Sequence, residues 1–213
     1  MTYEQMATHT IYQIEAKLDD FQPVIGRTIL INAERSLAYL GYTLISAFGL
    51  EGSHLFGFQK SFELFNHQQS YYYLLPAMDL PEFVAPGKHY SVMETNLNQF
   101  FSSSNLNNQF TFQYDFGDNW KISLNVESIE TKEIMLHDIP RVTGGSGYGL
   151  IEDIGGNSEL HDYIEAFASG DLDHYYQIFG NQLPHLRPFS LPIANEKLKP
   201  EISILKRQYE DNE

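Results

Sequence analysis

The sequence of 213 residues contains no cysteine. This absence excludes disulfide bonds, a cysteine nucleophile and cysteine-ligated zinc. Long apolar runs are also missing, because no stretch approaches the roughly 18 consecutive apolar residues of a membrane-spanning helix. The N-terminus, MTYEQMATHTIYQIEAK, lacks the basic start and apolar run of a signal peptide. We therefore expect a cytoplasmic protein that does not enter a membrane.

Positive charge is scarce. The chain has 13 Lys and Arg against 28 Asp and Glu, which gives a formal net charge of −15 at pH 7. Binding to a phosphate backbone depends on clustered basic side chains that release counterions. The densest basic stretch, residues 197–207, is interrupted by an acid, so direct nucleic-acid binding is disfavoured. The acidity either keeps the protein soluble or forms a surface for a basic protein partner.

Apolar side chains are plentiful, and their spacing predicts the fold class. Hydrophobic residues make up 42% of the chain, enough for a well-packed core. We expect one α+β domain over residues 1–213, with its core at about 10–198 and helices packed on a mixed or mainly antiparallel sheet. Alternating or β-branched residues predict strands at 11–18, 27–31, 54–59 and 70–75. Helical spacing predicts helices at 36–48, 92–101, 158–169, 171–179 and about 200–210. Loops are expected at 76–87, 102–108 and, rich in glycine, 140–156.

Single residues refine these boundaries. Gly49 is expected to end the helix at 36–48, and Ser158 to begin the helix that stops before Gly170. Pro200 is placed in the first turn of the last helix. Gly41, inside a helix, costs about 1 kcal/mol relative to alanine. We expect it to allow close packing of that helix on the sheet.

The clearest strand pattern surrounds the stretch YDFGDNW, residues 114–120. Apolar side chains alternate with polar ones on both sides of it, at Phe110, Phe112, Tyr114 and Phe116 and again at Trp120, Ile122, Leu124 and Val126. This pattern predicts a hairpin closed over residues 117–119. Gly117 is expected at positive φ, with Phe116 and Trp120 as core anchors.

This hairpin, YDFGDNWKISLNVESI, resembles a strand–turn–strand of the form YDFGDxWxHxIxLE in the plasmid pRiA4b ORF-3-like family. The stretches GLEGSHLFGF, LIEDIGG and FSLPIANEKL are similar to further segments of that family. The matching signature residues are His54, Tyr114, Asp115, Phe116, Gly117, Asp118, Trp120, Glu152, Asp153, Gly155 and Gly156. The resemblance covers about residues 10–198 and implies an α+β fold without an established activity. Members are often labelled transposon passenger or resolvase-like, which implies a link to mobile elements, but no recombinase pattern is present here.

The chain also departs from the family pattern. Ile122 stands where the family usually has His, residues 150–151 are Leu-Ile where it has Pro-Pro, and Ile154 stands in place of Cys. Any metal or catalytic site that used this His and Cys in other members is lost or altered here.

Four carboxylates of these motifs form a candidate metal site, namely Asp115, Asp118, Glu152 and Asp153. Carboxylates suit Mg²⁺, Mn²⁺ or Ca²⁺ and phosphoryl chemistry. The favoured alternative is structural: Asp118 belongs to an ordinary turn, and Asp115 accepts N–H bonds from the glycine-rich loop. In that alternative Glu152 and Asp153 stabilise the start of the next helix. Convergence on one point would support a metal, whereas bonds to backbone amides would support the structural role.

Other candidates have a structural and a functional interpretation. His54 is either a buried hydrogen-bonding residue or part of a site. His161 and Glu165 lie one helical turn apart, so they form either a metal pair or a solvated face. The glycines of 144–149 lack the patterns of a phosphate-binding loop and favour a mobile binding loop. The tyrosines of 71–73 either stack on bases or pack in the core.

Together these observations predict a non-enzymatic cytoplasmic protein that presents an acidic surface to a basic protein partner. A specific form of this hypothesis is an inhibitor that mimics the phosphates of DNA. The alternative is a metal-dependent enzyme, or an accessory of nucleic-acid processing, that uses the acidic cluster and a divalent metal ion. No other cofactor is expected.

Overall fold

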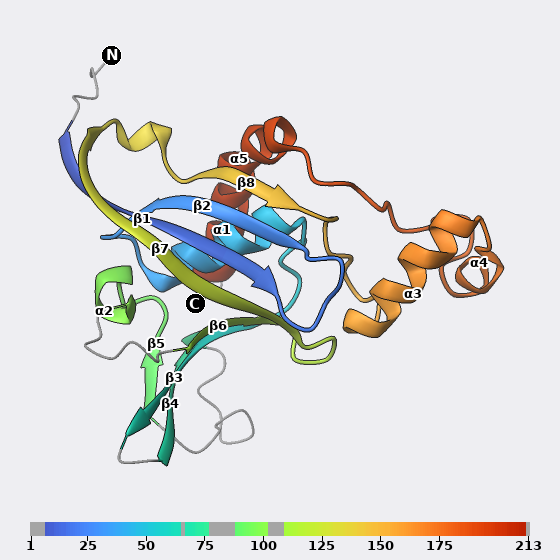
Figure 1. Ribbon diagram of the computed structural model, residues 1–213, viewed down its shortest axis with the longest axis horizontal. Coiled ribbons are helices and arrows are strands. Elements are labelled where there is room, and N and C mark those ends of the chain that lie inside the picture. The colour runs from blue at the N-terminus through green and yellow to red at the C-terminus, as the bar shows by residue number, and fades with distance from the viewer. Residues whose placement is uncertain (1–6, 65–66, 77–87, 102–108, 212–213) are drawn as a thin grey trace.

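A computed structural model describes residues 7–64, 67–76, 88–101 and 109–211 (Figure 1). Within these ranges one eight-stranded sheet has the order β5-β4-β3-β6-β7-β1-β2-β8. Its strands are β1 (Ala7–Leu18), β2 (Gly26–Asn32), β3 (Phe56–Leu64), β4 (His67–Leu74), β5 (Lys88–Ser91), β6 (Gln109–Tyr114), β7 (Trp120–Ile134) and β8 (Arg141–Ser146). All neighbours are antiparallel except β4 and β5, which are parallel. The predicted α+β fold with a mainly antiparallel sheet is confirmed.

The helices cover one face of the sheet and extend beyond its edge. They are α1 (Leu37–Phe48), α2 (Leu97–Phe101), α3 (Gly156–Ser169), α4 (Asp173–Phe179) and α5 (Leu191–Glu210). α1 lies against the sheet and α5 packs on α1, whereas α3 and α4 lie to the side of the sheet (Figure 1). No helix among the described residues is both long and apolar enough to cross a membrane.

Local sequence explains α1 and its packing. Ser36 accepts a hydrogen bond from the Tyr39 amide at 3.2 Å, and Gly49 ends the helix with φ at 81°. Both are standard helix-capping interactions. A Cβ atom on Gly41 would lie 2.4 Å from a ring carbon of Phe56 on β3. The predicted close packing at Gly41 is therefore confirmed.

The predicted hairpin forms from β6 and β7. Tyr114 pairs with Trp120 and Phe112 with Ile122, and all four side chains are buried. The turn between them was predicted wrongly in two respects. Its positive φ angles belong to Asp115 (52°) and Asn119 (58°) rather than Gly117, and the Phe116 side chain is 40% exposed instead of being a core anchor. Both errors arise because the loop has two more residues than predicted, so residue 116 lies outside the strand ladder.

Several predicted boundaries move in the structure. α5 begins at Leu191, with a proline in its first turn, so Pro200 lies inside the helix. α3 begins at Gly156 after Gly155, and Ser158 therefore lies in its first turn rather than at its cap. The helix predicted at 92–101 is limited to α2. Apart from its first residue, the predicted loop at 76–87 lies outside the described residues, as does the one at 102–108.

The glycine-rich segment predicted as a binding loop contains edge strand β8. This segment has no alternation of apolar and polar residues, and the Arg27 side chain explains how it is held against β2 and α1. Its side chain is buried and donates hydrogen bonds to the carbonyls of Gly26, Ala47, Ser146 and Tyr148 at 2.7–2.8 Å. Burial lowers the Arg27 pKa to about 10. Backbone pairing with β2 and this buried guanidinium thus replace the side-chain pattern that marks the other strands.

Candidate functional site

Three segments that are distant in the sequence meet at one end of the central strands β3, β6 and β7. One lies between α1 and β3, one is the β6–β7 turn, and one leads into α3. They bring together His54, Asp115, Asp118, Glu152 and Asp153, which we call the motif junction. Each segment carries one of the sequence motifs described above, so the motifs are assembled by the fold.

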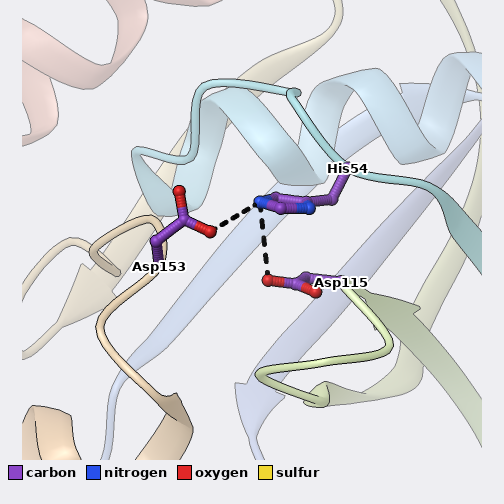
Figure 2. Close-up of side chains that lie close together, drawn as sticks. All are labelled: His54, Asp115 and Asp153. Atoms are coloured by element: carbon purple, nitrogen blue, oxygen red, sulfur yellow. Dashed lines mark hydrogen bonds and ion pairs between the residues drawn. The ribbon is translucent and has the colours of Figure 1, made fainter.

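At the motif junction, two carboxylates point to the same ring nitrogen of His54 (Figure 2). His54 Nε2 lies 3.0 Å from an Asp153 oxygen and 3.6 Å from an Asp115 oxygen. The side chains of His54, Asp115 and Asp153 are 31%, 8% and 72% exposed. The cluster is therefore closed on the Asp115 side and open to solvent on the Asp153 side.

Glu152 faces a different set of partners. One carboxylate oxygen accepts hydrogen bonds from the Tyr114 hydroxyl, from the Ser53 hydroxyl at 2.8 Å, and from the amides of Glu51 and Ser53 at 3.3 and 3.4 Å. Burial, together with the bond to Glu152, raises the Tyr114 pKa above its ordinary value. Glu152 therefore ties the segment before α3 to the segment that carries His54. This differs from its predicted role at the start of α3.

Asp118 has the role at the start of α3 that was predicted for Glu152 and Asp153. Its carboxylate accepts a hydrogen bond from the Gly155 amide at 3.1 Å, and burial raises its pKa. The Gly156 backbone has φ at 84°, and a Cβ atom there would lie 2.5 Å from the Asp118 carbonyl oxygen. Glycine at 156 therefore permits the turn and the start of α3 to touch.

The four predicted carboxylates thus divide into two pairs. Asp115 and Asp153 converge on His54, whereas Asp118 and Glu152 bond backbone amides. Asp115 also accepts a bond from the Gly117 amide at 2.9 Å, within its own turn instead of from the glycine-rich segment.

Two tyrosines support this site, of which Tyr114 is one of the signature residues and Tyr209 was missed by sequence reasoning. The Tyr209 hydroxyl, near the end of α5, donates to the carbonyl of His54 and, at 2.9 Å, to that of Gly52. The amide of His54 donates to the Tyr114 hydroxyl at 3.3 Å. His54 therefore has its backbone held from two sides while its ring stays partly exposed. Only the alternating pattern around Tyr114 indicated its burial, and nothing in the sequence indicated the contact of Tyr209.

The His54, Asp115 and Asp153 side chains have the chemistry of a divalent metal site. Their ligand atoms all lie within 4.8 Å of one another. Ligands bound at about 2 Å to one ion lie at most about 4 Å apart, so a small movement of the exposed Asp153 side chain would bring them into range. One histidine and two carboxylates suit Zn²⁺, Mn²⁺ or Fe²⁺ and leave positions open for water or substrate.

The remaining sequence candidates have plainer surroundings. His161 lies 3.7 Å from Asp162 and 3.8 Å from Glu165, and all three side chains are about half exposed or more. Their ligand atoms also lie within 4.8 Å of one another, so the metal pair and the solvated helix face both stay predictions. Tyr73 is buried against Tyr90 and Phe100, as expected for core packing.

α3 and α4 form a second feature next to the motif junction, which we call the arm (residues 156–179; Figure 1). The arm contains five acids, Glu159, Asp162, Glu165, Asp171 and Asp173, and neither Lys nor Arg occurs between residues 142 and 186. Three large apolar side chains on it are about half exposed, namely Phe167 (51%), Tyr176 (49%) and Ile178 (56%). Apolar patches rimmed by polar residues are typical of protein-binding sites, and the arm combines exposed apolar side chains with an acidic segment.

The root of the arm is anchored to the sheet. The Asn157 side chain donates to the Asp19 carbonyl at 2.7 Å, and the rings of Phe21 and His161 are 6.2 Å apart. Farther out, Tyr163 packs edge-on against Tyr175 at 4.7 Å and joins α3 to α4. The arm therefore has a small aromatic core of its own.

Comparisons with known proteins agree with this architecture. The family model described as plasmid pRiA4b ORF-3-like protein matches residues 10–182. A similar solved structure is that of a protein of unknown function, MM3350, from Methanosarcina mazei Go1, with a TM-score of 0.67 and 18% sequence identity. That match covers 88% of this chain and 97% of the other, and it shows a common fold. A search of curated proteins gave no significant match.

Proposed function

The chain belongs to the plasmid pRiA4b ORF-3-like family, and we propose that it is a non-enzymatic cytoplasmic protein that binds a basic protein partner through the arm. The observation that carries this proposal is the composition of the arm surface. The arm carries five acids and three exposed apolar side chains, and no Lys or Arg occurs in residues 142–186. The acids attract a basic partner, and the apolar side chains supply contact area that is removed from water on binding.

The arm defines the chemistry of its partner. A partner surface with Lys or Arg around an apolar patch would match both the charge and the exposed rings. Proteins that bind DNA carry basic surfaces, so an inhibitor that imitates phosphates, with a link to mobile elements, is a specific form of the proposal. The ordered apolar side chains distinguish the arm from a purely electrostatic mimic.

Affinity capture from an extract of the native host, at low and moderate salt, tests the proposal. The arm variant carries Asp162→Asn and Glu165→Gln, two changes at side chains that are 61% and 72% exposed. We expect the wild type to retain a basic protein that the arm variant releases. Because salt screens exposed charges, the wild type should also retain less partner at moderate salt, and its difference from the arm variant should be larger at low salt.

A control variant with Glu130→Gln and Glu133→Gln removes the same charge from β7. It should retain the partner as the wild type does. A second variant, Phe167→Ser with Ile178→Ser, should release the partner at both salt concentrations. Equal retention by all variants, or no specific partner at either salt, would contradict binding through the arm.

A second candidate function is a divalent-metal site at His54, Asp115 and Asp153. It is supported by the convergence of their ligand atoms within 4.8 Å. In this alternative the protein is a metal-dependent enzyme or an accessory of nucleic-acid processing. The ion would lie beside the exposed Asp153 side chain, where a substrate has access, and would polarise an oxygen or activate a water molecule.

Calorimetric titration with Mn²⁺ and Zn²⁺ separates this candidate from the structural role of the same residues. Asp153→Asn should abolish binding with little effect on folding, because the Asp153 side chain is 72% exposed. The control is Glu133→Gln, which removes an exposed carboxylate of β7 that belongs to neither group of possible metal ligands. Absence of saturable binding by the wild type, or equal loss in both variants, would rule out a metal at the motif junction.

A further inference from the structure

We propose that a cavity between β8 and α5 binds a small phosphate monoester through Arg141 and Lys199. The cavity has a volume of about 510 Å³ and is lined by residues from both elements. The cavity is open to solvent, and its volume lies within the roughly 300–1,000 Å³ of small-molecule sites. None of the residues of the motif junction or the arm lines it, so the proposal is independent of both functions above.

The walls of the cavity are fixed before any ligand binds. The Asn195 side chain on α5 accepts a hydrogen bond from the Val142 amide at 2.9 Å and donates one to the Val142 carbonyl at 2.8 Å. β8 is an edge strand. On the side where β8 has no neighbouring strand, the Asn195 side chain supplies hydrogen-bond partners for the Val142 backbone. The two walls therefore keep their separation, and a ligand does not have to order them.

The charge of the cavity is opposite to that of the whole chain. Acids outnumber Lys and Arg by 28 to 13, yet Arg141 and Lys199 both line this one cavity. In the described part of the chain, neither of them forms an ion pair. One acid, Asp138, also lines the cavity, so with His137 neutral the lining carries one more positive than negative charge. Two unpaired cations beside one cavity create a local positive potential that favours an anion.

The lining also indicates which anion fits. The planar guanidinium of Arg141 can bond two phosphate oxygens at once, and Lys199 adds a compact positive charge. The cavity volume exceeds that of a phosphate group, and Pro140, Val142 and Leu191 provide apolar lining beside the cations. A phosphate monoester places its dianion against the cations and its organic group against these side chains.

NMR titration of isotope-labelled protein with glycerol phosphate, and separately with inorganic phosphate, tests this site at about 0.15 M KCl, where exposed charges are screened. We expect saturable shifts of the amides of residues 141–143 and 195–199, with tighter binding of glycerol phosphate. Arg141→Gln and Lys199→Gln should each weaken binding by about tenfold or more, as expected for the loss of a charge-assisted hydrogen bond. Arg141→Lys should also weaken it, because the fork of donors is lost.

Lys197→Gln is the matched control, since Lys197 lies on the same helix but does not line the cavity. It should bind as the wild type does. Thermal unfolding checks that all variants fold, which is expected because Arg141 and Lys199 are exposed. Shifts that do not saturate, or that change equally in the Lys197 and Lys199 variants, would overturn the proposal. Tighter binding of a phosphoserine peptide than of glycerol phosphate would also overturn it, in favour of a protein ligand.

Discussion

We call the sheet with α1 and α5 the body. The body and the arm both contain large apolar side chains, but they differ in how these side chains are packed. In the body, aromatic rings such as Trp120, Phe56 and Phe112 are fully buried. In the arm, Tyr163 and Tyr175 are buried, but Phe167 and Ile178 are half exposed in a segment that carries five acids. The body also exposes a few apolar side chains, such as Ile129 and Ile204, but most of its apolar surface is buried. The arm is smaller and exposes three large apolar side chains in a segment without Lys or Arg. The motif junction lies where the two regions meet.

We expect the largest difference between the body and the arm in the free energy of unfolding when one aromatic side chain of each is truncated to alanine. Trp120→Ala should lower the free energy of unfolding by about 3–5 kcal/mol, because it removes a large side chain that is fully buried. Phe167→Ala should change it by about 0.5 kcal/mol or less, as is usual for exposed positions. Chemical denaturation of both variants measures the two values. Similar values would show that the arm is as tightly packed as the body.

A smaller effect is expected at the contact between the regions. Gly156→Ala places a methyl group 2.5 Å from the Asp118 carbonyl, at a left-handed backbone position. We expect a loss of about 1–3 kcal/mol, with faster amide exchange in α3 than in α1. The control is Gly170→Ala, which has a similar φ of 80° but no atom within 4 Å of the added carbon. If the two variants are equally destabilised, the contact with Asp118 contributes nothing beyond backbone strain.

Alkaline pH should act mainly on the body. Burial raises the Tyr73 pKa to about 12, and it also raises the pKa values of Tyr42, Tyr114 and Tyr209. An unfolded tyrosine loses its proton near pH 10, so the folded state holds more protons above that pH and its stability falls as pH rises. Each such tyrosine contributes up to about 1.4 kcal/mol per pH unit. Tyr114→Phe should reduce the slope of unfolding free energy against pH between about 10 and 12 by that amount; an unchanged slope would contradict the burial of this hydroxyl.

The smallest effect is expected for the arm acids. Asp162→Asn with Glu165→Gln should change the free energy of unfolding by about 0.5 kcal/mol or less, since exposed charges contribute little to stability. The same variant is the one expected to lose its partner. Measuring chemical denaturation and partner capture on the same variant thus shows whether these acids contribute to binding or to stability. A large loss of stability would remove that distinction.

Much of the body could be predicted from the sequence because its signals are local. Alternation around YDFGDNW gave the β6–β7 hairpin, and the helical spacing with Ser36 and Gly49 gave α1. β8 could not be predicted, because it depends on pairing with β2 and on the buried side chain of Arg27. α5 begins nine residues before the predicted start, because the proline at 200 was read as a first-turn residue.

The residues of the candidate site could be predicted from the sequence, but the contacts between their side chains could not. The resemblance to the family selected His54 and the four carboxylates, yet residue types alone give equal weight to all four. Only the fold sends Glu152 toward Tyr114 and Asp153 toward His54, since the two adjacent side chains leave the backbone in different directions. The sequence therefore indicates which segments meet, while long-range packing decides which side chains face each other.

The bonds from Tyr209 to the segment that carries His54 also set an order of events during synthesis. Tyr209 follows His54 by 155 residues, and ribosomes add about 5–20 residues per second. The nascent chain therefore holds an incomplete site for roughly 8–30 s, until the last helix has emerged and docked. During that interval the His54 loop lacks the hydroxyl that fixes its carbonyl, so a ligand that needs the finished geometry would bind only after α5 has docked.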